Sequence, residues 1–286
     1  TFIATATAVS ELGAVPLFVD VEPESLNLDP ADLRRRLNKK TKAVIPVHLY
    51  GHPADMDGVL AAAKDAGLAV VEDCAQAHLA RSRGRPVGAL GDYGAFSFYP
   101  SKNLGAIGDA GALSTKDPAL HEAAVVLRNV GRKPGGQYEH VRIGRNARLD
   151  EIQAAFLRVK LKRLASWTES RARLAKRYLE NLKGLPLRLP PADGDGTQSA
   201  WHLFVIQTPK RDALAAHLKK AGISTAVYYP QPLHLQAAYR FLGGKAGDLP
   251  ESERASAEVL ALPFFPELAP EKTDRVVEEI RRFFGE

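Results

Sequence analysis

The first 128 residues alternate short apolar stretches with segments of helical pattern, and this alternation constrains the fold more than any other feature of the chain. Apolar stretches predict strands at residues 15–19, 43–48, 68–72 and 94–98. Helices are expected to start at Asp29, before Pro30, and to span residues 55–66, ending at Gly67. Strands joined by helices build parallel sheets with right-handed crossovers. The pattern therefore predicts an α/β fold with a mostly parallel sheet.

The second half of the chain predicts a smaller unit. Residues 149–183 lack proline and glycine and predict one or two long helices. Residues 184–199 contain three prolines and three glycines, which is typical of a domain boundary. A strand at 203–206, a helix at 211–221, a strand at 223–229 and an amphipathic helix at 271–284 follow. We therefore expect a large domain over residues 1–183 and a small α/β domain over 184–286.

Composition narrows the class of protein. No apolar run reaches the length of a membrane span, and the single cysteine, Cys74, suits a reducing compartment, so we expect a cytoplasmic protein. The formal charge of +6 is dispersed along helices among acidic residues, which favours a mixed-charge surface over a nucleic-acid site. The exception is residues 128–148, where six basic residues accompany only Glu139. This loop is either a flexible basic segment or a site for a phosphate-bearing substrate.

Two predicted strand ends carry the chemistry. Lys102 lies in a loop of small residues after one strand, between Pro100 and Gly105, and Asp73 directly follows another. In open α/β sheets ligands bind at the carboxyl ends of the strands, so both residues are expected at one edge. A lysine that forms a Schiff base and an acid that keeps a pyridine nitrogen protonated are the two groups that pyridoxal phosphate chemistry most needs.

Each of these residues also has a purely structural interpretation. Lys102 could be a solvated lysine, and Asp73 could cap a following helix. The Ser97 hydroxyl could bind a phosphate or satisfy nearby backbone, and Gln76 could contact a ring substituent or support its turn. His234 stands on a rigid loop between prolines, and Phe2 by default belongs to the core. The sequence has no metal-ligand spacing, Walker A lysine or nucleophile elbow.

Six segments together resemble the DegT/StrS family of fold-type-I enzymes, the nucleotide-sugar aminotransferases that depend on pyridoxal phosphate. In order along the chain they are TFIAT (1–5), PVHLYG (46–51), EDCAQAH (72–78), FSFYPSKN (96–103), GRNARLD (144–150) and YPQPLH (229–234). Each segment alone is a weak signal, whereas six in order, spread over nearly the whole chain, are a specific one.

The resemblance implies a role for each matching residue. Lys102 would hold the cofactor as a Schiff base and later shuttle the proton between substrate and cofactor carbons, while Asp73 would pair with the pyridine nitrogen. The other cofactor contacts would come from Gln76 to the ring hydroxyl, Ser97 to the phosphate, Phe2 and Ala75 on the two ring faces, and Asn146 in the neighbouring subunit. His234, Arg145 and Tyr229 would contact substrate.

The resemblance also implies the reaction and its partners. An amino group would pass from an amino acid, expected to be glutamate, to a nucleotide-linked keto sugar by a ping-pong mechanism, in a homodimer with shared active sites. Such enzymes make sugars for polysaccharides or antibiotics. The alternatives are transfer to a cyclitol or another keto substrate, and a catalytically silent binding or regulatory piece. The second alternative rests on an expected amino-terminal truncation: the family has a phosphate-binding segment before the position of Thr1, and the given sequence begins after it. This sequence also departs from the family at two positions, where Ala110 and Tyr228 stand in place of the glycine and histidine that are common in family members.

Overall fold

The computed structural model describes residues 1–285 and centres on a four-stranded sheet in the order β1-β2-β5-β6. The strands are β1 (Ala43–Val44), β2 (Ala69–Asp73), β5 (Tyr93–Ser97) and β6 (Gly111–Ser114). β1 pairs with β2 and β2 with β5 in parallel, whereas β6 runs antiparallel to β5. The predicted mostly parallel sheet is therefore confirmed.

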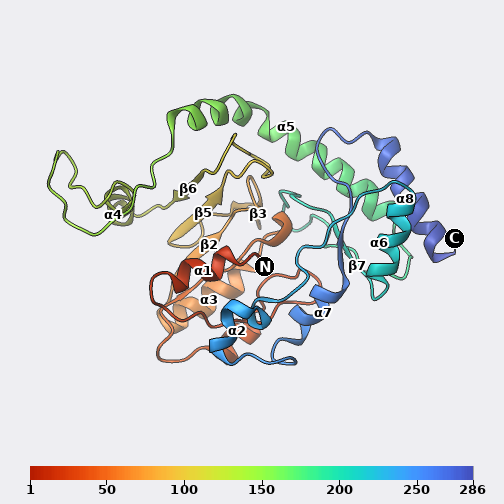
Figure 1. The fold of residues 1–286 in the computed structure, drawn as a ribbon, viewed down its shortest axis with the longest axis horizontal. Helices are drawn as coiled ribbons and strands as arrows, with labels where there is room; N and C mark the ends of the chain where they lie inside the picture. The colour runs from red at the N-terminus through yellow and green to blue at the C-terminus, as the bar shows by residue number, and fades with distance from the viewer. Residues whose placement is uncertain (286) are drawn as a thin grey trace.

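Capped helices cover this sheet. α2 (Pro30–Arg36) starts where the Asp29 side chain accepts a hydrogen bond from the backbone of Ala31, and α3 (Met56–Ala66) ends at Gly67, whose φ of 63° is left-handed. α2 and α3 bury their apolar sides with β1 and β2 in a core that includes Leu33, Val44, Met56, Val59 and Val70. The amino-terminal helix α1 (Ala4–Ser10) lies on the same side of the molecule (Figure 1).

One long helix links the sheet to the carboxyl-terminal part. α5 (Glu151–Asn181) spans the top of the molecule from α4 (Pro118–Arg128) toward α6 (Arg211–Lys220) and α8 (Pro270–Phe284) (Figure 1). Its second half contributes Leu174 and Tyr178, and its C-cap contributes Leu182, to the core formed by α6, α8, β7 (Val205–Gln207) and β8 (Val259–Ala261). The domain boundary expected near residue 183 lies just after this helix ends and stays a prediction.

The remaining elements are short. β3 (Arg81–Ser82) and β4 (Arg85–Pro86) form a small hairpin. The segments η1 (Leu49–Gly51), η2 (Leu233–Leu235) and η3 (Ala237–Leu242) are short 3-10 helices, and α7 (Pro250–Glu258) precedes β8. α7 returns to the amino-terminal part of the chain, where the carboxylate of Asp20 accepts hydrogen bonds from the backbone of Glu251 and Ser252.

Two predicted strands are wrong. Residues 15–19 form no strand and instead line a cavity, and of residues 223–229 only Ala226 makes a bridge, to Ala261. Both segments are apolar enough to be strands, but residues 15–19 pair with no strand among the described residues, and residues 223–229 pair with β8 only at Ala226. Whether these apolar segments formed strands therefore depended on the availability of a neighbouring strand to hydrogen-bond with, rather than on the local sequence pattern.

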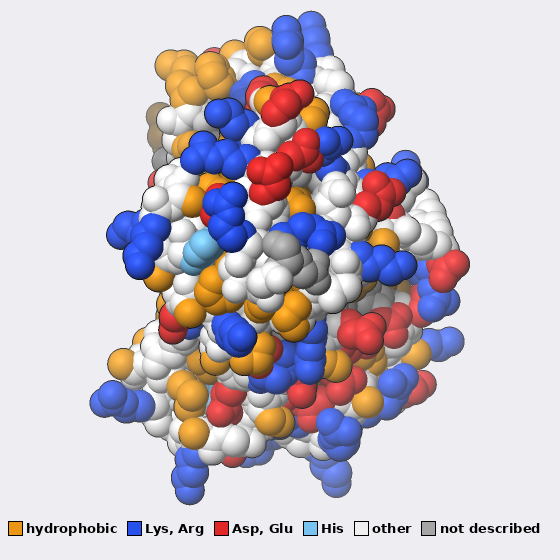
Figure 2. Space-filling view, turned by 90° about the vertical axis from the view of Figure 1, so that its right-hand side faces the viewer, with side chains coloured by type: hydrophobic (Ala, Val, Ile, Leu, Met, Phe, Trp, Pro, Cys, Tyr) orange, Lys and Arg blue, Asp and Glu red, His pale blue; other side chains and the backbone are white. Residues whose placement is uncertain are grey.

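The surface carries both signs of charge. Basic and acidic side chains are interspersed on the face near the end of α8 (Figure 2). Among the described residues, no helix combines the length and apolar character that a bilayer crossing requires.

Residues 129–150 extend away from the body beyond α4 as a long loop at one end of the molecule (Figure 1).

Candidate active site

Lys102 and Asp73 lie at the same edge of the sheet because β2 and β5 are parallel neighbours. β2 ends at Asp73, which pairs in register with Ala95, and β5 ends two residues later at Ser97. Lys102 follows in a tight turn, in which its backbone N–H donates to the carbonyl of Tyr99 at 2.8 Å. A side chain at Gly105 would overlap the carbonyl of Pro100, so only glycine permits this turn.

The Lys102 amine is half-buried and has no hydrogen-bond or ion-pair partner among the described residues. Burial lowers its pKa below the usual value of a lysine, and the charge of Asp73 opposes that shift in part. A larger share of neutral amine is therefore present near neutral pH than for a surface lysine. Only a neutral amine can attack an aldehyde, so the environment suits imine formation.

The Asp73 carboxylate is held from two directions. Its Oδ2 accepts a hydrogen bond of 2.6 Å from the hydroxyl of Thr5 on α1, and its Oδ1 accepts one of 3.0 Å from the backbone N–H of Ala75. No helix begins after Asp73, so the helix-cap interpretation is wrong. The carboxylate is instead held at the carboxyl end of β2, where it can pair with a cationic nitrogen.

Ser97 makes the local backbone contact that its structural interpretation predicted, whereas Gln76 bonds to a distant segment rather than within its own turn. Gln76 Oε1 accepts a hydrogen bond of 2.6 Å from the backbone of Tyr50, and the Gln76 side chain also bonds with Tyr229. The Ser97 oxygen accepts from the backbone of Tyr99 at 3.3 Å. Its hydroxyl proton remains free to donate, because a hydroxyl can accept and donate at once.

The aromatic and histidine candidates flank this edge. Phe2 is 56% exposed and its ring lies 5.8 Å from that of Tyr229. Burial raises the pKa of Tyr229, so its hydroxyl stays protonated. His234 is buried, and its Nε2 lies 3.0 Å from Glu253 Oε1. Ala75 lies half-buried beside Asp73.

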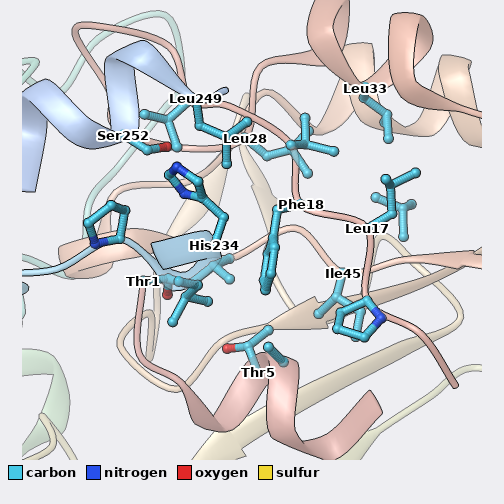
Figure 3. Close-up of a pocket in the computed structure, with 18 of the residues that line it drawn as sticks. Thr1, Thr5, Leu17, Phe18, Leu28, Leu33, Ile45, His234, Leu249 and Ser252 are labelled. Carbon is cyan, nitrogen blue, oxygen red and sulfur yellow. The ribbon is translucent and has the colours of Figure 1, made fainter. Parts of the chain in front are cut away.

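A cavity of about 770 Å³ opens next to these residues, lined by Thr5, Tyr229 and His234 together with the segment 14–19. Phe18 projects into its middle, with His234 on one side and Thr5 rising from α1 (Figure 3). Lys102 and Asp73 do not line it. The cavity therefore adjoins the lysine–aspartate pair through Thr5 and Tyr229 without containing it.

Arg145 and Asn146 lie apart from this cluster in the single chain. Arg145 pairs with Glu11 at 3.1 Å on the surface, and Asn146 forms a β-bridge with Asn129. Both are exposed, as the predicted contact with a second subunit requires. The structure of one chain brings together the residues at 2–5, 73–76 and 97–102 but not these two.

His48, Glu72 and Cys74 also approach one another, within 4.8 Å, below the strand edge. His48 Nδ1 accepts from the backbone of Ala54 at 3.0 Å, so its Nε2 carries the proton that faces Glu72 at 3.2 Å. The Glu72 carboxylate further accepts from the backbone of Gly88, Leu90 and Gly91. These bonds occupy the ligand atoms of His48 and Glu72, so the group secures the strand rather than offering a metal site.

Three further residues near Lys102 were missed by sequence reasoning: Thr5, His202 and Arg171. Thr5 is one threonine among several in a helix, and nothing in the local pattern marks it. His202, 100 residues after Lys102, bonds to Asn103 beside it only through the fold, and Arg171, 69 residues after Lys102, bonds to the backbone of His202. A buried arginine in a long helix is unusual enough to be noticed, but burial is visible only in the structure.

A half-buried, unpaired lysine facing a fixed carboxylate at the strand edge of an α/β sheet defines the kind of site that binds pyridoxal phosphate covalently. The donor set fits that cofactor, with an amine for its aldehyde, a carboxylate for its ring nitrogen and a free hydroxyl at Ser97. The chain belongs to the DegT/DnrJ/EryC1/StrS aminotransferase family, whose model matches residues 1–281.

Curated relatives agree with this assignment. The chain is 50% identical to the erythromycin biosynthesis sensory transduction protein EryC1 of Saccharopolyspora erythraea and 45% identical to the dTDP-3-amino-3,4,6-trideoxy-alpha-D-glucose transaminase of Streptomyces venezuelae. The matches cover 98% and 99% of this chain and 76% and 74% of those proteins. It is also 49% identical, over 99% of its length and 76% of the relative's, to a protein of Geobacillus stearothermophilus named pleiotropic regulatory protein.

Solved structures show the same fold. The S. venezuelae protein DesV, in complex with a ketimine intermediate, superposes with a TM-score of 0.96 at 45% identity, over 100% of this chain and 76% of DesV. NtdA of Bacillus subtilis with bound PMP superposes with a TM-score of 0.90 at 30% identity, over 100% of this chain and 66% of that protein. Family and structures confirm the predicted fold class, the aminotransferase activity on a keto sugar and the pyridoxal phosphate cofactor.

Proposed function

We propose that the acceptor is a keto sugar carried on a nucleoside diphosphate and that glutamate is the amino donor. The observation that carries this proposal is the unpaired Lys102 amine near Asp73, beside a cavity that an extended substrate can enter. Relatives named as transaminases of dTDP- and UDP-linked sugars support the acceptor class. Glutamate as the donor is proposed from the resemblance to the family.

Different residues of this chain would hold the cofactor, move protons and keep the ring nitrogen charged. When bound, pyridoxal phosphate supplies an electron sink for the substrate carbon. Lys102 holds the cofactor through its amine and then moves a proton to and from the substrate carbon. Asp73 keeps the ring nitrogen protonated, and its own position is fixed by Thr5 and the Ala75 backbone.

Other residues orient the cofactor and close the site around it. The Ser97 hydroxyl would donate to the phosphate, and Gln76, already anchored on the Tyr50 backbone, would face the ring substituent. Phe2 and Ala75 would enclose the ring faces. Tyr229 and His234 border the adjoining cavity and would contact the sugar.

We further propose a homodimer in which residues 129–150 complete the partner's site. This loop extends from the body (Figure 1) and exposes apolar side chains to solvent in the single chain. Tyr138 is 82% exposed and Ile143 is 99% exposed, and Ile152 continues the apolar surface onto α5. A second copy covering this surface would remove it from water and bring Asn146 to a phosphate and Arg145 to the sugar's diphosphate. The buried thiol of Cys74 supports a cytoplasmic location.

Reductive trapping tests the proposal. The purified protein is incubated with pyridoxal phosphate, reduced with borohydride and mapped by mass spectrometry, with Lys64→Ala on α3 as a control. We expect the adduct on Lys102 and consumption of the cofactor absorbance when glutamate is added. Lys102→Ala is expected to abolish amino transfer. An adduct on another lysine, or a protein that never binds the cofactor, would overturn the proposal and favour the regulatory alternative that one relative's name suggests.

A further inference from the structure

The turn that carries Lys102 is attached to a distant segment through the next residue. Asn103 is buried, and its Nδ2 donates a hydrogen bond of 2.7 Å to the carbonyl of Ala200. Its Oδ1 lies 2.9 Å from Nδ1 of His202. Because the amide nitrogen serves the carbonyl, the amide oxygen must accept from His202, so the Nδ1 of that ring carries the proton.

Residues 199–203, here called the strap, are themselves held on two sides. The backbone N–H groups of Ala200 and His202 donate to the carbonyls of Gly51 and Tyr50, both at 2.9 Å. A side chain at Gly51 would come within about 3 Å of the strap backbone and of the Gln76 carbonyl, so the three segments pack without space between them. The strap thus lies against the same edge of the sheet as Asp73 and Gln76.

Arg171 fixes the strap from the other side. Its Nη1 donates to the carbonyls of Trp201 and His202, both at 3.1 Å, and its guanidinium lies 5.6 Å from the ring of Phe264. Burial lowers the pKa of Arg171 to about 10, which still leaves it charged at neutral pH. A charged donor at this position connects α5 to the strap and, through His202, to the Lys102 turn.

We propose that Asn103 and His202 are positioning residues that clamp the Lys102 turn to the strap, so that during turnover the lysine side chain moves while its backbone does not. The inference rests on the function proposed for Lys102 and deepens it. Lys102 has to leave the cofactor carbon and return as a base to within proton-transfer distance, and misplacement of about 1 Å can cost about 100-fold in rate.

The charges around the turn are consistent with this role. The titratable groups that interact electrostatically with Lys102 are the carboxylate of Asp73 and the imidazoles of His78 and His202. Burial, and then the charge of Lys102, lower the pKa values of both histidines. His202 therefore stays neutral and keeps its single proton on the nitrogen that faces Asn103. The bond between His202 and Asn103 is therefore kept near neutral pH.

Two polar replacements of His202 separate positioning from packing. An asparagine places its amide nitrogen near the position of Nδ1, whereas a glutamine places it near Nε2. His202→Asn should keep the bond to Asn103, and His202→Gln should lose it. Asn103→Ser removes the same bond from the other side and serves if His202→Gln does not fold. His52→Gln, at a half-buried histidine outside the clamp, is the matched control.

The first readout needs no cofactor. The pKa of the Lys102 amine is measured in the cofactor-free protein from the pH dependence of its acetylation, read by peptide mapping. We expect the lowered pKa of Lys102 in the wild type, His202→Asn and His52→Gln proteins. In His202→Gln and Asn103→Ser we expect this pKa to rise by about one unit, because the freed turn admits water to the amine. The second readout is steady-state kinetics, where the two unclamped variants should lose about 10- to 100-fold in kcat with KM for the sugar nearly unchanged.

A merely structural role would give a different pattern. If folded His202→Gln and Asn103→Ser keep both the Lys102 pKa and kcat, or if His202→Asn is as impaired as His202→Gln, the inference is overturned. The proposed function would survive that outcome provided that Lys102→Ala is inactive. An active Lys102→Ala would instead reject the proposed function, whatever the clamp variants do.

Discussion

The hydroxyl of Thr5 donates a 2.6 Å hydrogen bond to Oδ2 of Asp73 across 68 residues of sequence. It joins the amino-terminal helix to the strand end that holds the proposed partner of the cofactor nitrogen. A carboxylate that accepts a bond on each oxygen has little freedom to rotate. This contact and the strand register together determine where the negative charge of the site lies.

Thr5→Val should slow amino transfer by about 10-fold while leaving the fold intact, because valine has nearly the same shape and lacks the hydroxyl. Thr5→Ser should keep most of the activity. Thr7→Val is the matched control, since the Thr7 hydroxyl bonds to the carbonyl of Ile3, the N-cap of the same helix. Equal rates for Thr5→Val and Thr7→Val would show that Asp73 needs no support from α1.

Asp73→Asn should lose far more rate than cofactor affinity. A neutral amide cannot keep the ring nitrogen protonated, so we expect a fall in kcat of at least about 100-fold. Because the charge of Asp73 raises the pKa of Lys102, this variant should also lower that pKa further. Steady-state rates, a cofactor titration and the acetylation profile of Lys102 check the three statements. Near-normal turnover would contradict the proposed role of Asp73.

A shared active site should be visible by complementation. Lys102→Ala and Asn146→Asp proteins are each expected to be nearly inactive alone. In a mixed dimer, one of the two sites would combine native Lys102 with native Asn146 from the other subunit, and part of the activity should return. Subunit exchange is verified with a size tag on one variant. An exchanged but inactive mixture would place Asn146 outside the partner's site.

Glu72→Gln should lower the free energy of unfolding by about 3 kcal/mol or more. Glu72 is fully buried and accepts hydrogen bonds from three backbone N–H groups and from His48. Burial alone would raise the pKa of Glu72, but these bonds outweigh it and lower the pKa, so the ionised form is the native one. The amide NH₂ of a glutamine at this position would point a hydrogen-bond donor at the N–H groups that now donate to the Glu72 carboxylate. Urea unfolding compares this variant with Glu11→Gln on the surface, for which we expect almost no change.

His78 should make the protein less stable in mild acid. Burial, helped by the charge of Lys102, lowers the pKa of His78 from 6.5 to about 4. Between these values the unfolded chain binds a proton that the folded chain does not, so stability is present above pH 6.5 and is lost as the pH falls toward 4. The full effect of this one group is roughly 3 kcal/mol. In His78→Phe the slope of unfolding free energy against pH should be smaller over this window, and an unchanged slope would contradict the assignment.

Much of the site was predictable because it depends on local order along the chain. The strand ends at Asp73 and Ser97, the caps at Asp29 and Gly67, and the turn bearing Lys102 all follow from apolar runs and adjacent turn residues. Parallel pairing then brings the two strand ends together without further information.

What sequence could not supply was contact between distant segments. Thr5 reaches Asp73, and His202 reaches Asn103, only through the three-dimensional path of the chain. Residues 15–19 have a strand's composition, but they have no strand partner among the described residues. Whether an apolar run becomes a strand or a cavity wall depends on its neighbours in space, which a periodic pattern does not contain.

Helix α5 also determines how the molecule folds as a unit. Its first half packs Leu157 and Leu164 near the Lys102 turn, and its second half completes the carboxyl-terminal core with Leu174 and Tyr178. A fragment of residues 184–286 would leave that core open on one side. The two halves of the protein should therefore melt in one cooperative transition, and chemistry at the sheet edge should be lost at the same temperature as the distant core.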